Sequence, residues 1–120
     1  MTVTNRFAFR STGNEWKGKL LDCTDPNAPI PVDLTGFDKV YIIFRKSNGI
    51  QFPTDDQIRD GFDQGAFLEN PSTPGDSNIV FLDKDTPSIL DLRGSWYFTP
   101  AAKIGNTVIK SPVKTIFWVE

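Results

Sequence analysis

The fold is decided by one stretch of the chain, Lys39-Val40-Tyr41-Ile42-Ile43-Phe44-Arg45-Lys46. Successive side chains of a strand point to opposite faces, so every second residue of this stretch shares a face. One face is wholly apolar and is predicted to enter the core, with Val40, Ile42 and Phe44. The other face is mixed, with Tyr41, Ile43 and Arg45, so it is either half covered or part of a contact surface.

A tight hairpin is predicted directly after this strand. Asn48-Gly49 offers the pair of positive-φ residues that such a turn needs. Ile50-Gln51-Phe52 is predicted to return as the second strand. Pro53 ends it, because proline cannot donate a hydrogen bond to the ladder.

Outward from this hairpin, the chain breaks into short apolar runs separated by turn residues, a pattern typical of a β-sandwich. Further strands are predicted at residues 3–10, 15–23, 78–82, 93–99 and 113–120. Pro29 and Pro31 place the segment 30–36 at an edge or crossover. Gly105-Asn106 marks another hairpin tip. A single helical turn that crosses between sheets is predicted at 85–92, where a capping residue precedes Pro87.

The segment 54–77 differs from the rest and is predicted to be a long inserted loop. Its first part, Thr54 to Gly61, has the pattern of a capped helical turn. Phe62, Phe67 and Leu68 are its few apolar anchors. A connection of this length is uncommon in a compact domain and is often functional. The simpler interpretation is an insertion pinned to the body by its two Phe side chains.

Together these elements predict an all-β fold in a single domain over residues 1–120. The architecture that they favour is an immunoglobulin-like antiparallel β-sandwich of about seven to eight strands, with one short helical turn and the long inserted loop. Composition agrees, because the aromatic residues are ten Phe, three Trp and two Tyr, and large rings suit a pleated, half-buried surface.

Charge and cysteine usage exclude several classes of partner. The net charge is −2 with both signs well mixed, so neither a phosphate-binding stripe nor a polybasic membrane patch is present, and no nucleic acid or membrane is expected as a partner. No apolar run approaches the roughly 20 residues that span a bilayer, and the N-terminus lacks the pattern of a signal peptide. Cys23 is the one cysteine, so no internal disulfide is expected, as in a protein made in a reducing cytoplasm.

The residues that usually carry catalysis are largely missing. The chain has no His, which removes the commonest general base, the usual serine triad and most zinc sites. Cys23 therefore has no His to activate it, and no glycine-rich phosphate loop is present. We predict a protein that is not an enzyme, with no catalytic residue, no cofactor and no metal ligand.

The inserted loop contains one acidic cluster, which comprises Asp55, Asp56, Asp60 and Asp63. Paired carboxylates are the groups used in glycoside hydrolysis, and closely spaced oxygens also suit calcium. The cluster lacks the alternating ligand pattern of the standard calcium loop, and Arg59 opposes a cation. Solvated loop charges are the favoured interpretation, and binding of a glycan or an ion by the loop stays open.

Apolar side chains on outward-facing positions predict a protein-contact surface. In the last strand, Ile116 and Trp118 lie on the opposite face from Phe117. In the 39–46 strand, Tyr41 and Ile43 lie on the opposite face from Ile42 and Phe44. The predicted contact residues are Tyr41, Ile43, Ile116 and Trp118 on strands, with Phe62 and Phe67 in the inserted loop. The same aromatics would equally line a sugar-binding groove.

The order of these pieces resembles a known family. Pro31-Val32-Asp33-Leu34-Thr35-Gly36 precedes the first long strand, and Gly94-Ser95-Trp96-Tyr97-Phe98 opens the penultimate one. This order is similar to that of the β-sandwich domains of tailed-bacteriophage structural proteins, in particular the N-terminal domain of baseplate upper proteins and related tail-associated domains. The resemblance covers roughly residues 15–119, and the 54–77 insert is longer and more aromatic than the family pattern.

The resemblance implies a non-enzymatic virion structural protein that is made in the host cytoplasm and assembles into a phage tail or baseplate. Its partners would be other virion proteins, contacted in multiple copies with particle symmetry. The family often continues into a second domain, whereas this sequence stops at Glu120, so the chain is expected to be a free-standing copy. Two alternatives remain, a capsid decoration or cement protein and a carbohydrate-binding or host-adhesion module.

Overall fold

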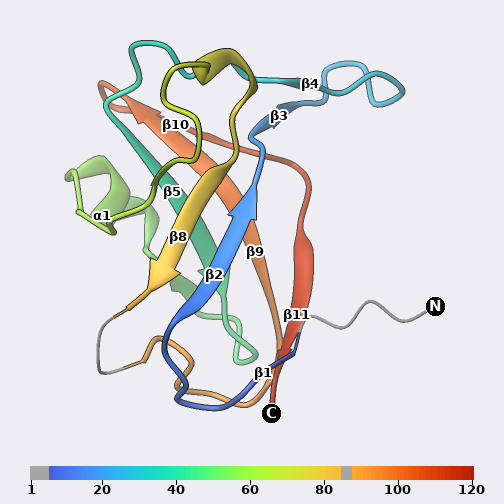
Figure 1. Cartoon of the computed structure of the whole chain (residues 1–120), viewed down its shortest axis with the longest axis vertical. Helices are drawn as coiled ribbons and strands as arrows, with labels where there is room; N and C mark the ends of the chain where they lie inside the picture. The colour runs from blue at the N-terminus through green and yellow to red at the C-terminus, as the bar shows by residue number, and fades with distance from the viewer. Residues whose placement is uncertain (1–5, 85–87) are drawn as a thin grey trace.

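The computed structural model describes residues 6–84 and 88–120, and almost all of its regular structure is β-strand (Figure 1). The all-β class predicted from the sequence is therefore confirmed. The described residues form eleven strand segments, more than the seven or eight predicted, because one predicted run is split and the strands at 67–68 and 107–110 were not predicted. The run 15–23 divides into β2 (Asn14–Gly18) and β3 (Leu21–Asp22).

The larger sheet is built around two long antiparallel strands, β5 (Lys39–Arg45) and β9 (Gly94–Ile104). Its strand order is β1 (Arg6–Phe7), β11 (Thr115–Val119), β9, β5 and β6 (Gln51–Phe52). Strand β10 (Thr107–Lys110) pairs with the second half of β9, along the edge that β11 uses in the first half. The sheet is mixed, which corrects the purely antiparallel prediction, because β1 runs parallel to β11.

A three-stranded sheet lies over one face of the larger sheet (Figure 1). Its order is β2, β8 (Ile79–Asp83) and β7 (Phe67–Leu68), so β8 is central, as its apolar run suggested. The remaining strands, β3 and β4 (Ile30–Pro31), pair only with each other. This separate pair agrees with the edge or crossover role predicted for residues 30–36.

Aromatic rings from both sheets meet in the space between them. Trp16 on β2 lies edge-on to Phe44 on β5 at 5.0 Å and 5.7 Å from Phe117 on β11, measured between ring centroids. The apolar face predicted for the 39–46 strand is buried here, because Ile42 and Phe44 have no exposed surface. This contiguous cluster is the main core.

The hairpin after β5 forms as predicted, but with a different turn. Within this hairpin loop only Gly49 has a positive φ, 86°. Its N–H donates to the carbonyl of Lys46 at 2.9 Å. Asn48 instead uses its side-chain oxygen to accept the N–H of Ile50. One left-handed residue after a turn is the pattern of a three-residue hairpin loop, which needs positive φ only at the glycine.

Strand β9 runs further than the sequence predicted and passes through Pro100. The carbonyl of Pro100 accepts the N–H of Ser111, which lies between β10 and β11. The missing N–H of Pro100 thus falls at the junction where β9 changes its neighbour from β11 to β10, and no ladder bond is lost there.

The inserted segment contains more structure than a loop. Helix α1 (Asp55–Arg59) is capped by Thr54, whose hydroxyl accepts the N–H of Gln57, and the Gln57 side chain accepts the N–H of Thr54 in return. The capped turn predicted there is confirmed. A 3-10 turn, η1 (Pro74–Asp76), follows β7. The helical turn predicted at 85–92 lies partly outside the described residues, and 88–92 are not helical.

Candidate outer-face contact site

Two apolar pairs were predicted to face outward on the larger sheet, and the structure treats them differently. Tyr41 and Ile43 on β5 do point away from the main core, but they are buried, with 0% and 5% of their surface exposed. The prediction that they form an exposed stripe is therefore wrong. The inserted segment covers them, because Ile58 of α1 is buried together with both in a second, smaller apolar cluster.

The cover is held to β5 by hydrogen bonds as well as by packing. The Tyr41 hydroxyl donates to the carbonyl of Phe62 at 2.7 Å, and burial raises the pKa of this phenol, with a smaller contribution from the charge of Asp63. The side-chain amide of Gln64 accepts the N–H of Ile42 at 2.9 Å and donates to its carbonyl at 2.7 Å. Gln64 thus takes the place of a paired strand at this edge.

Ile116 and Trp118 on β11 have no such cover. They are exposed over 61% and 51% of their surface, as predicted for outward positions. Ile116 lies directly opposite Tyr97 on β9, which in turn lies opposite Arg45 on β5. The exposed apolar pair therefore continues into a polar row that crosses the outer face.

The two phenylalanines of the insert do not join this surface. Phe62 is half buried and packs edge-on against Phe52, with the ring centroids 5.8 Å apart. Phe67 is 43% exposed, but it belongs to β7 in the smaller sheet. The six predicted contact residues are therefore distributed over three places, and only Ile116 and Trp118 form an exposed pair on the larger sheet.

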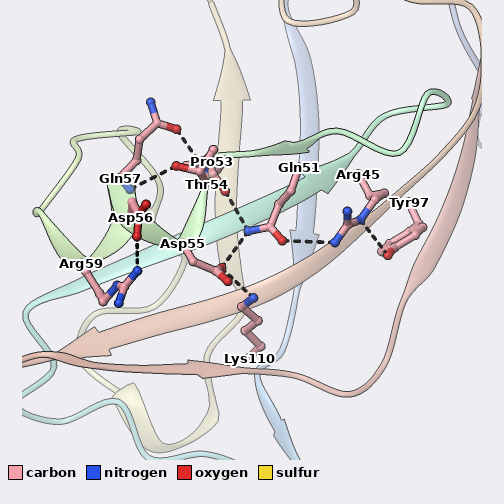
Figure 2. A network of polar contacts seen from close by, with 10 residues as sticks. All are labelled: Arg45, Gln51, Pro53, Thr54, Asp55, Asp56, Gln57, Arg59, Tyr97 and Lys110. Carbon is pink, nitrogen blue, oxygen red and sulfur yellow. Dashed lines mark hydrogen bonds and ion pairs between the residues drawn. The ribbon is translucent and has the colours of Figure 1, made fainter.

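A polar network crosses the outer face beside this pair (Figure 2). Arg45 donates to the hydroxyl of Tyr97 at 3.1 Å, to the carbonyl of Gly49 at 2.6 Å and to the side chain of Gln51 at 3.3 Å. All three acceptors are neutral. The guanidinium is thereby held in one orientation while its charge stays uncompensated within residues 6–84 and 88–120.

The network ends at helix α1. The Gln51 amide donates to Asp55 at 2.9 Å, and Lys110 of β10 pairs with the same carboxylate oxygen at 2.7 Å (Figure 2). The hydrogen bonds from Lys110 and Gln51 lower the pKa of Asp55. These contacts tie α1 to β6 and β10, so the cover over Tyr41 and the polar row are parts of one arrangement.

A shallow groove of about 170 Å³ lies along this row. Arg45, Tyr97, Lys110 and Lys114 supply its charged and aromatic lining. The Lys114 ammonium sits 4.8 Å from the centroid of the Tyr97 ring. Small-molecule sites usually have at least roughly 300 Å³, so the groove is better suited to one or two side chains of a partner than to a cofactor.

The sequence contained a partial signal for this groove. Arg45 and Tyr97 both lie on the outward parity of their strands, opposite Phe44 and Phe98. Only the register of β5 against β9 brings them together, however, and Lys110 belongs to a strand that was not predicted.

The acidic cluster of the insert does not converge on one point. Asp55 pairs with Lys110 and Asp56 with Arg59, whereas Asp63 accepts the N–H of Gly65. Within the described ranges no group of three or more His, Cys, Asp or Glu side chains is arranged to hold a metal ion. Cys23 lies just after β3 and is half exposed.

No protein-family model, curated protein or solved structure matches this chain. In the part of the chain that the structure describes, no helix is both long and apolar enough to cross a membrane.

Proposed function

We propose that the protein is a non-enzymatic structural module that binds other proteins through the outer face of its larger sheet. In this proposal the two stacked sheets are an immunoglobulin-like sandwich, and the module assembles into the tail or baseplate of a tailed bacteriophage as one of many symmetric copies. Its partners are other virion proteins, without nucleic acid or membrane.

The observation that carries the contact role is the exposed pair Ile116 and Trp118 beside preorganised cations. Aromatic residues and Arg are enriched at protein interfaces, and a well-packed Trp is among the commonest energetic hot spots. Arg45 is already ordered by its bonds to Tyr97 and Gln51, so a partner would pay little entropy to use it. The placement in a phage particle is supported by the order of sequence motifs.

Purified particles test this function directly. Particles assembled with the Ile116→Ala/Trp118→Ala chain are expected to contain at least about tenfold less of it than wild-type particles, because interface hot spots are worth about 2 kcal/mol or more. Both residues are exposed, so thermal unfolding should be unchanged. Ile50→Ala is the matched control, since Ile50 is 56% exposed on the β5–β6 loop. Wild-type incorporation of the double variant would refute the proposal.

Trp118 also favours a second function, glycan binding, because an exposed indole provides a flat surface on which a sugar ring stacks. A glycan array probed with the wild-type chain and the Trp118→Ala variant separates the two functions. Specific glycan binding that Trp118→Ala removes, together with normal particle incorporation, would favour the adhesion module over the structural one.

A further inference from the structure

A hairpin arm projects from the body of the molecule and pairs with neither of the two stacked sheets (Figure 1). It consists of β3, β4 and the loop 23–29 between them, and the two strands pair with each other alone. All residues from Thr24 to Ile30 are exposed, and Ile30 is exposed over 59% of its surface. Ile30 therefore offers a neighbouring molecule an apolar side chain that the body of the fold leaves uncovered.

The charged residues of the arm and of the segment that follows it are all acidic. Residues 20–38 contain four Asp and no Lys or Arg. Asp22 and Asp25 lie in the arm, and each uses Oδ1 to accept a backbone N–H two residues ahead, at 2.9 and 3.0 Å. Neither carboxylate has an ion-pair partner in the described part of the chain. Their charges are therefore available to a neighbour.

The arm is also preorganised. The two Asp side chains fix the turn, as in Asx turns, and Pro26, Pro29 and Pro31 restrict the backbone around the tip. The N–H of Val32 donates to the carbonyl of Leu20 at 2.8 Å and closes the base of the arm. Docking a segment that is already ordered costs less conformational entropy than docking a flexible one.

The outer-face groove has the opposite charge, because its charged lining consists of Arg45, Lys110 and Lys114. Asp22 and Ile30 are cross-strand partners, so the arm presents a carboxylate beside an isoleucine on one face. Lys114, which lines the groove, lies two residues before Ile116, and both residues are exposed. Lys114, like Arg45, has no carboxylate partner among the described residues, so an ion pair and an apolar contact can form together.

We propose that the arm of one copy docks into the outer-face groove of a second copy. The carboxylates of Asp22 and Asp25 meet Lys114 and Arg45, and Ile30 packs on Ile116 and Trp118. Arm and groove are different surfaces, so the contact is heterologous and propagates as a ring or a filament. This inference rests on the proposed assembly function and specifies its partner as the same chain.

Self-association of the purified chain, measured by sedimentation and light scattering, tests this contact. Asp22→Asn/Asp25→Asn keeps the oxygens that order the turn but removes the charge, and Lys114→Glu reverses the charge of the groove. Each is expected to weaken self-association by at least about tenfold, a loss comparable with that at close charge pairs of interfaces. Raising the salt concentration should weaken the wild-type contact in the same direction.

Matched controls carry the same charge changes elsewhere. Asp60→Asn/Asp63→Asn removes the charges of two exposed acids that have no ion pair in the described residues. Arg93→Glu alters an exposed cation whose described contacts are with Phe9 and, through its carbonyl, Ser47. Both controls should associate as the wild type does. Association that falls equally in the controls would overturn the specific contact and indicate a general charge effect.

A mixing experiment identifies the two surfaces. The chain Asp22→Asn/Asp25→Asn/Asn27→Lys/Ala28→Lys has a basic arm, and Lys114→Glu has an acidic groove site. Each should fail to assemble alone, whereas an equimolar mixture should recover assembly because every arm then finds a complementary groove. Failure of the mixture to assemble would overturn the proposal.

The outcome is distinguishable from that of the proposed function. A wild-type chain that stays monomeric up to about 1 mM would overturn the arm contact, and normal incorporation of the arm variant into particles would do the same. Neither result touches the proposed function, which fails only if the Ile116→Ala/Trp118→Ala chain is incorporated normally.

Discussion

Strands β5 and β11 each place a pair of apolar side chains on the same outer face of the larger sheet, but the two pairs differ in burial. Tyr41 and Ile43 on β5 are buried, whereas Ile116 and Trp118 on β11 are exposed. The difference comes from the inserted segment, because its Ile58 and Phe62 belong to the apolar cluster that buries the β5 pair, and that cluster includes no residue of β11. An outward-facing apolar pair thus becomes a second core or a contact surface according to what another part of the chain does.

Removing the cover should have the largest effect. Ile58 is fully buried and is the buried residue of α1, so Ile58→Ala is expected to lower the free energy of unfolding by about 2–5 kcal/mol, the usual cost of truncating a buried isoleucine. Urea denaturation measures this value. Ile50→Ala, at an exposed site, should change it little, and a similarly small loss for Ile58→Ala would show that the insert does not stabilise β5.

A smaller loss is expected when the edge of β5 is opened. Gln64→Ala removes both hydrogen bonds to Ile42 and should cost about 1–3 kcal/mol. Amide hydrogen exchange should show faster exchange at Ile42 in particular, since its N–H is left without the Gln64 acceptor. Gln64→Glu keeps an acceptor but loses the donor, so it should fall between wild type and Gln64→Ala. Unchanged exchange at Ile42 would contradict the edge-pairing role.

The ion pair at the end of the insert should contribute less, and only above acidic pH. The pKa of Asp55 is lowered by Lys110 and Gln51, so its stabilisation is complete above the unfolded pKa, about 3.9, and is lost as pH falls through the lower folded value. The side chain is 57% exposed, so we expect less than about 1 kcal/mol. Asp55→Asn should differ from wild type at pH 7 and converge with it in strong acid.

The uncovered pair should contribute least to folding. Ile116→Ala and Trp118→Ala are each expected to change the free energy of unfolding by no more than about 0.5 kcal/mol, as is usual at surface sites. Thermal unfolding of both variants measures this. A loss as large as that of Ile58→Ala would mean that the β11 pair is part of the fold and not a free contact surface.

The sequence predicted the strands with clear alternation and the local signals that punctuate them. The strand through Val40, the hairpin at Gly49 and the capped turn after Thr54 were all predicted, because each depends on residues close together in the chain. Strand β10 and the continuation of β9 through Pro100 were missed. A proline inside a strand argues against it unless the neighbouring strands happen to change at that position.

The groove was only partly predictable for a related reason. Arg45 was placed on the outward face, but its bonds to Tyr97 and Gln51 depend on the register of three strands. The basic and acidic surfaces that we propose to meet also involve segments far apart in sequence. Their charges are evident in the sequence, whereas their exposure and their lack of internal partners are properties of the folded chain.

Alternation along each strand was determined by the sequence alone, because the geometry of a strand assigns neighbouring side chains to opposite faces. It predicted that Ile116 and Trp118, like Tyr41 and Ile43, point away from the main core. Only the tertiary structure decided which of these pairs is covered, because burial requires a partner surface, and here that surface is an insert whose position over β5 depends on contacts with β6 and β10.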